Sequence, residues 1–149
     1  MDNNDQVIYW DASAILSALF KDSHSHIATK WAEKDAAHFL STLAYSEVCA
    51  VISRMRKENI LSDILIKSSF EVFDQGPWRR ITISPEWEIT RDLSQKWSLR
   101  GADLWHLATS KSLQKDFPEL FMLTFDSRLE TAAKGEGLIS LTGFRPSPE

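Results

Sequence analysis

The sequence VIYWD at residues 7–11 decides the fold that we expect for this chain. Its four apolar residues are β-prone and end on an acid, which is typical of a short buried strand. The segment that follows, ASAILSALF at residues 12–20, places apolar residues at helical spacing. A buried strand that passes at once into a helix predicts an α/β protein.

Further strands and helices alternate along the rest of the chain. We expect strands at 38–41, 80–83, 121–125 and 138–141. We expect helices at 26–34, 45–57, 62–73, 85–97, 102–114 and from 127 to near 135. This alternation predicts an α/β sandwich with a mostly parallel sheet.

Composition limits the class of protein. The chain has 149 residues and a mass of 17.0 kDa, the size of one domain. Apolar residues make up 43% and charged residues 26%, so a folded domain is expected rather than disorder. The single cysteine, Cys49, excludes an internal disulfide and a CxxC zinc site. The net charge of −4 excludes a basic module that binds nucleic acid by bulk charge.

Two features bear on location in the cell. The first six residues, MDNNDQ, are acidic and polar, unlike the basic start of a signal peptide. No apolar stretch approaches the ~18 residues of a transmembrane helix. We therefore expect a cytoplasmic protein.

Four acidic residues fall where a parallel sheet could bring them to one edge. Asp11 and Asp126 each follow a strand, and ligands bind outside the carboxyl ends of strands in open α/β sheets. Glu47 and Asp103 lie in the predicted first turns of two helices, where the helix dipole favours negative charge. Each of the acids that begins a helix also has a purely structural interpretation as a helix cap.

If these carboxylates converge, their charges must be compensated. Two carboxylates ~4 Å apart repel by about 4 kcal/mol at an effective dielectric constant of 20. A cluster of four therefore takes up protons or binds a cation. Oxygen ligands without cysteine favour Mg²⁺ or Mn²⁺ over zinc. Such ions polarise phosphoryl groups and lower the pKa of an attacking water, so the pattern predicts phosphate chemistry.

The sequences around the four acids form a set. They read YWDASAIL around Asp11, STLAYSEV around Glu47, LRGADLWHLA around Asp103 and LTFDSRLETAAKGEGL around Asp126. In this order the set resembles the motifs of the PIN-domain ribonucleases, and specifically their VapC-like toxin branch. The resemblance implies a three-layer α/β/α sandwich formed by one domain over residues 1–149, with a core at 7–141 and a short tail at 142–149.

The resemblance also implies an activity, a cofactor and partners. The activity is endoribonuclease cleavage that depends on Mg²⁺ or Mn²⁺. The implied metal-binding and catalytic residues are Asp11, Glu47, Asp103 and Asp126, with Ser13 and Thr124 as supporting hydroxyl residues. The implied partners are RNA, a cognate antitoxin protein and a second copy of the chain in a homodimer. The protein would then be the toxin of a type II toxin–antitoxin pair.

Other residues have both a structural and a functional interpretation. His106 lies three residues after Asp103 and can share its helical face, although a partly buried, hydrogen-bonded histidine is the simpler interpretation. Basic clusters at residues 54–57 and at Arg79 and Arg80 could contact RNA phosphates or serve solubility alone. The six tryptophans are too scattered for one stacking platform, so most are expected in the core.

Three further functions stay open on the sequence. The chain could be a PIN-like nuclease outside any toxin–antitoxin pair. Asp11 could be the nucleophile of an aspartyl phosphotransferase or phosphatase, although such enzymes commonly carry a second acid two residues later, where this chain has Ser13. The acids could also be helix caps in a non-catalytic protein-binding module, whose stability would not depend on metal.

Overall fold

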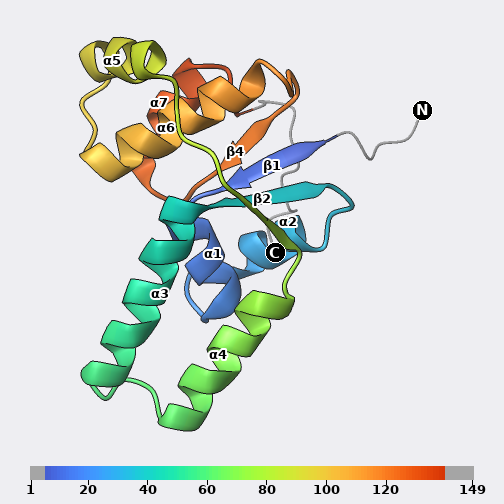
Figure 1. Ribbon diagram of the computed structural model, residues 1–149. Helices are drawn as coiled ribbons and strands as arrows, with labels where there is room; N and C mark the ends of the chain where they lie inside the picture. The colour runs from blue at the N-terminus through green and yellow to red at the C-terminus, as the bar shows by residue number, and fades with distance from the viewer. Residues whose placement is uncertain (1–5, 140–149) are drawn as a thin grey trace.

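The computed structural model describes residues 6–139 and contains a four-stranded sheet between two layers of helices (Figure 1). The strands are β1 (Val7–Trp10), β2 (Ala37–Ser41), β3 (Trp78–Ile81) and β4 (Phe121–Leu123), in the order β3-β2-β1-β4. Each neighbouring pair is parallel. The predicted α/β sandwich with a parallel sheet is confirmed.

The central strand, β1, is buried along its whole length. It pairs with β2 on one side and with β4 on the other, and helices cover both of its faces. Ile8 and Trp10 point into the core beneath one helical layer, and Val7 and Tyr9 point into the other. The run VIYW is therefore apolar on both faces, as expected for a parallel strand covered from both sides.

The helices divide into two layers. One face of the sheet is covered by α1 (Ala12–Leu19), α2 (Ser25–Ala32), α3 (Thr42–Lys57) and α4 (Asp63–Gln75). The other face is covered by α5 (Trp87–Lys96), α6 (Gly101–Gln114) and α7 (Ser127–Gly135). In Figure 1, α3 and α4 extend away from the sheet on one side, and α5, α6 and α7 lie together on the other. No helix within residues 6–139 is long and apolar enough to cross a membrane.

The predicted boundaries of one helix and one strand are wrong, and strand β2 gives the reason in both cases. The helix expected at 45–57 already begins at Thr42, because the Ser41 side chain accepts a hydrogen bond from the Ala44 amide at 3.2 Å and caps it. The strand expected at 80–83 is displaced to Trp78–Ile81. Since Ser41 pairs with Ile81 and β2 ends there, residues 82 and 83 have no partner strand.

The strand predicted at 138–141 extends past the last described residue, Ile139. Leu138 and Ile139 form no strand, although the Leu138 carbonyl accepts a hydrogen bond from the Met122 amide at 2.8 Å. Residues 140 and 141 and the expected tail at 142–149 lie outside the described residues.

The tryptophans are only partly in the core. Trp10 and Trp31 are buried, whereas Trp87, the first residue of α5, is 92% exposed. The remaining three, Trp78, Trp97 and Trp105, are half-buried.

Candidate active site

The carboxyl edge of the sheet contains a point where the strand order reverses. The chain runs outward from β1 through β2 to β3 and then returns to place β4 on the other side of β1. Crevices at such a reversal are the usual ligand sites of open α/β sheets. Asp11 follows β1 directly, and Thr124 and Asp126 follow β4.

Asp11 is the most enclosed acid at this edge, with 4% of its surface exposed. Its Oδ1 accepts hydrogen bonds from Ser13 Oγ at 2.7 Å and from the Ala14 amide at 2.9 Å, and its Oδ2 accepts one from Thr124 Oγ1 at 2.5 Å. Burial raises the pKa of the Asp11 carboxyl above its ordinary value, and these donors and nearby His106 oppose that rise. The bond to Ala14 is a helix cap, so the cap interpretation is correct and leaves Oδ2 facing β4.

Ser13 and Thr124 join the two segments that meet at the reversal. Besides binding Asp11, Ser13 Oγ accepts a hydrogen bond from the Phe125 amide at 3.0 Å. Thr124 Oγ1 accepts one from the Asp126 amide at 3.1 Å. Both hydroxyls that the sequence pattern indicates therefore hold the carboxylate edge together.

Asp103 and Asp126 bring two further helices to this edge. Asp126 caps α7 by accepting a hydrogen bond from the Leu129 amide at 2.9 Å. Asp103 lies in the first turn of α6 and is half-buried. Burial and the negative charges of Asp126 and Glu47 raise the pKa of the Asp103 carboxyl, and nearby His106 and Arg100 oppose that rise. Asp126 and Glu47 are thus close enough to act on Asp103.

Glu47 reaches the site from deeper in its helix than expected. Because α3 begins at Thr42, Glu47 lies in its second turn, so the prediction that it occupies the first turn is wrong. Its Oε1 is 2.6 Å from His106 Nε2. The Glu47 side chain is 33% exposed, whereas the His106 side chain to which it is hydrogen-bonded is 1% exposed.

Comparison with known proteins identifies the family. The family model described as PIN domain matches residues 8–135. The chain belongs to the PIN-domain family. It is 29% identical over 135 residues to ribonuclease VapC45 of Mycobacterium tuberculosis (strain CDC 1551 / Oshkosh), an alignment that covers 88% of this chain and 92% of that relative.

Solved structures agree with this fold. Mycobacterium tuberculosis VapC20, described as a sarcin–ricin loop cleaving toxin, superimposes with a TM-score of 0.56 at 14% identity, over 84% of this chain and 94% of that one. VapBC2 from Rickettsia felis, bound to a DNA fragment from its promoter, gives a TM-score of 0.53 at 14% identity, over 80% of this chain and 99% of that one.

The donor set of this PIN domain fits a hard divalent cation by its chemistry. Its acids offer carboxylate oxygens, the ligands that Mg²⁺ and Mn²⁺ prefer. Burial and, after it, the negative charges of Asp126 and Glu47 raise the pKa of Asp103, and a cation would relieve the second of these causes. Within residues 6–139, no three His, Cys, Asp or Glu side chains already stand in a ready metal-binding group.

His106 is the residue of this PIN domain whose importance the sequence hides. The sequence predicts a partly buried side chain, but it is only 1% exposed and contacts an acid 59 positions away. Its spacing from Asp103 indicates a shared helical face. Nothing local could indicate Glu47 as its partner, since the two meet only after α3 and α6 pack around β1.

Proposed function

We propose that this PIN domain is a metal-dependent endoribonuclease and the toxin of a type II toxin–antitoxin pair. The observation that carries the proposal is the buried Asp11 carboxylate at the reversal between β1 and β4, which is held by two hydroxyls and shares the neighbour His106 with Glu47 and Asp103. Burial of a carboxylate is costly, and a domain keeps one where its charge serves a function.

In this proposal Asp11, Glu47, Asp103 and Asp126 hold Mg²⁺ or Mn²⁺. When bound, the cation polarises the scissile phosphodiester and offsets the charge that develops on it. Ser13 and Thr124 fix the orientation of Asp11. Glu47 and Asp126, the more open acids, face the substrate side and are placed to orient an attacking water.

RNA as substrate and an antitoxin as partner are supported by the relatives. VapC45 carries the name ribonuclease, VapC20 is described as cleaving the sarcin–ricin loop, and the Rickettsia felis structure is a VapBC complex. The proposal also includes action in the cytoplasm as a homodimer. A nuclease role outside toxin–antitoxin systems shares the same site and differs only in lacking the antitoxin.

A phosphotransferase and a non-catalytic module find less support in the site. A phosphotransferase needs Asp11 as a free nucleophile, yet both of its oxygens accept hydrogen bonds. A non-catalytic module explains the caps at Asp11 and Asp126, but it gives no reason for Glu47 and Asp126 to lie near Asp103.

The test is cleavage of a fluorescently labelled single-stranded RNA with Mg²⁺, Mn²⁺ or EDTA. We expect cleavage only with the ions, and a loss of about 100-fold or more in Asp11→Asn and Glu47→Gln. Asparagine can still cap α1 through its one oxygen, but its amide nitrogen cannot accept the hydrogen bond from Thr124, so the first variant removes the charge and one acceptor. Asp63→Asn is the matched control, because Asp63 begins α4 on the exposed surface and pairs with Arg56. Undiminished cleavage in both site variants, or cleavage in EDTA, would overturn the assignment.

A further inference from the structure

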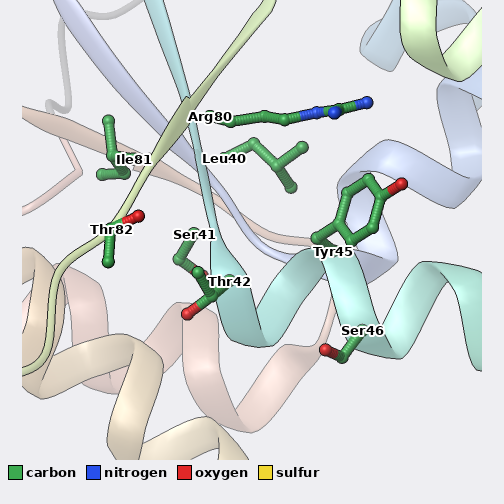
Figure 2. Close-up of a pocket in the computed structure, with 8 residues that line it drawn as sticks. All are labelled: Leu40, Ser41, Thr42, Tyr45, Ser46, Arg80, Ile81 and Thr82. Carbon is green, nitrogen blue, oxygen red and sulfur yellow. The ribbon is translucent and has the colours of Figure 1, made fainter.

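The first inference concerns a hollow on the same edge of the sheet, above the carboxyl ends of β2 and β3. It has a volume of about 400 Å³. The hydroxyl residues Thr42, Ser46 and Thr82 lie around it, and Leu40 and Ile81 supply apolar surface (Figure 2). Polar groups around a small apolar surface are the usual composition of a site for an organic ligand.

Arg80 is held in place at this hollow. Its Nη2 donates to Asp74 Oδ1 at 2.7 Å, and its guanidinium lies 4.8 Å from the centre of the Tyr45 ring. The Tyr45 ring stacks in turn on the buried Phe73. A guanidinium carries five N–H donors, so the bond to Asp74 fixes its orientation and leaves donors for a ligand.

The hollow continues the candidate active site. Because all four strands are parallel, Asp11 at the end of β1 and the hollow above β2 and β3 share one edge. Neighbouring strands are about 4.8 Å apart, so the hollow lies roughly 5–10 Å from the end of β1. Ser46 also directly precedes Glu47 on α3.

We propose that this hollow binds a nucleotide of single-stranded RNA next to the cleaved phosphodiester, with Arg80 on a phosphate and the hydroxyls on the base or ribose. The inference rests on the proposed nuclease function. It adds a subsite that supplies positive charge beside an acidic centre, where a polyanion would otherwise be repelled. Arginine suits this role because its planar fork matches the geometry of phosphate oxygens.

The test compares Arg80→Gln with Arg79→Gln. Arg79 is the adjacent residue on β3, is exposed and carries the same charge, but successive strand residues point to opposite faces. For Arg80→Gln we expect KM for single-stranded RNA to rise about 10-fold, with kcat within a factor of two. The slope of log affinity against log salt, measured in EDTA by fluorescence anisotropy, should fall by about one.

Arg79→Gln should leave KM and the salt slope within a factor of two of their wild-type values. Arg80→Lys should recover part of the affinity that Arg80→Gln loses. Equal effects of the two glutamine variants would overturn the subsite while leaving the nuclease proposal intact. A wild-type protein that cleaves no RNA would instead overturn the nuclease proposal.

The second inference rests on a different observation, the buried chain that ends at Glu47. His106 Nε2 is 2.6 Å from Glu47 Oε1, and His106 Nδ1 is 2.6 Å from the Tyr9 hydroxyl. The Tyr9 hydroxyl donates to Ser41 Oγ at 3.1 Å. Ser41 caps α3, and Glu47 lies on α3. The series of hydrogen bonds therefore begins at the cap of this helix and ends on the helix itself.

The hydrogens of this chain can be assigned from what each group can donate. Tyr9 uses its hydrogen on Ser41, so its oxygen accepts from His106 Nδ1–H. Glu47 as a carboxylate only accepts, so His106 Nε2–H donates to it. Both ring nitrogens then carry a hydrogen, so this arrangement is that of a His106 imidazolium paired with the Glu47 carboxylate. Every member except Glu47 is buried, which leaves the carboxylate little freedom to turn.

We infer that His106 and Tyr9 are positioning residues that act through Glu47, holding its carboxylate ready for a divalent cation. This inference also rests on the proposed function. Hydrogen-bond partners behind a metal ligand commonly account for 10- to 100-fold in metal affinity. A histidine kept only for packing would have no such effect.

The test uses two substitutions that each retain one half of the imidazole. Glutamine places an amide near the position of Nε2 and can still bind Glu47, whereas asparagine reaches only the position of Nδ1, beside Tyr9. We expect His106→Asn to lower the affinity for Mn²⁺, measured by electron paramagnetic resonance of the free ion, by 10-fold or more. His106→Gln should stay within about threefold of wild type, although both variants lower the melting temperature.

Equal Mn²⁺ affinities in the two variants, whether both retained or both lost, would overturn the positioning role. A wild-type protein that binds no Mn²⁺ would instead count against the nuclease proposal itself.

Discussion

The two halves of the sheet's carboxyl edge use opposite chemistry. Above β1 and β4 the strands end in acids, and the most enclosed, Asp11, is fixed by donors from both sides of the reversal. Above β2 and β3 the edge carries neutral hydroxyls and the exposed Arg80. Within residues 6–139 the one buried acid is Asp11, and it lies where two distant segments meet and supply hydrogen bonds to it.

This difference predicts which half of the edge needs its hydrogen-bond partners for the stability of the fold. A buried carboxylate that loses a donor remains desolvated, so the full cost appears in the free energy of unfolding. An exposed hydroxyl or guanidinium that loses a partner regains water. Substitutions in the acidic half should therefore affect stability, and those at exposed side chains of the hollow such as Ser46, Arg80 and Thr82 should affect substrate binding alone.

The largest expected effect is stabilisation of the acidic half by a cation. At Mn²⁺ concentrations of 100 times its Kd, binding to the folded state adds about 2.7 kcal/mol and should raise the melting temperature by about 5–10 °C. Asp103→Asn should remove most of this rise, whereas the surface control Asp63→Asn should retain it. The measurement is thermal unfolding by circular dichroism, and a flat response in the wild type would favour a non-catalytic module.

A smaller effect comes from single hydroxyls in the two halves. Thr124→Val removes a donor from buried Asp11 and should lower the free energy of unfolding by about 1–3 kcal/mol. Thr82→Val removes an exposed hydroxyl from the hollow and should change it by less than about 0.5 kcal/mol. Urea unfolding measures the free energy of unfolding of both variants. Equal decreases in the two would show that the acidic half does not depend on its hydrogen bonds more than the hollow does.

The smallest effect is the dependence of metal-free stability on pH. The pKa of the Asp103 carboxyl is raised above 3.8 by burial and by neighbouring negative charge, so the folded state binds this proton more tightly than the unfolded state. The contribution of Asp103 to the free energy of unfolding should therefore fall as pH rises from about 4 through the raised pKa.

Asp103→Asn cannot release that proton and should show a shallower fall. Urea titrations in EDTA between pH 4 and pH 7 would measure the difference. A slope unchanged by the substitution would show that the neighbouring charges do not act on Asp103 in solution.

The parts of the site that can be predicted from the sequence are those encoded locally. Asp11 and Asp126 stand out because each directly follows an apolar strand and precedes a helix, a pattern contained in a few consecutive residues. The hydroxyl residues Ser13 and Thr124 are indicated by the resemblance to PIN-domain motifs, whereas the hydrogen bond from Thr124 to Asp11 joins residues 113 positions apart. The sandwich follows from the alternation of such segments.

The parts that the sequence does not reveal depend on contacts between distant segments. The extent of β3 is set by the register of β2, and the contact between Glu47 and His106 joins residues 59 positions apart. The start of α3 is a different case. Ser41 is a typical cap, and its hydroxyl is a local signal that places Glu47 correctly in the second turn.

The position of β1 between β2 and β4 has a consequence for the order in which the protein becomes active. Of the strands within residues 6–139, β1 is synthesised first and β4 last, and Asp11 and Thr124 are separated by 113 positions. A growing chain can fold β1 to β3 early, but Asp11 lacks the partner that fixes it until β4 has left the ribosome. The proposed nuclease site therefore stays incomplete until that point, while the chain is still tethered to the RNA-rich machinery that makes it.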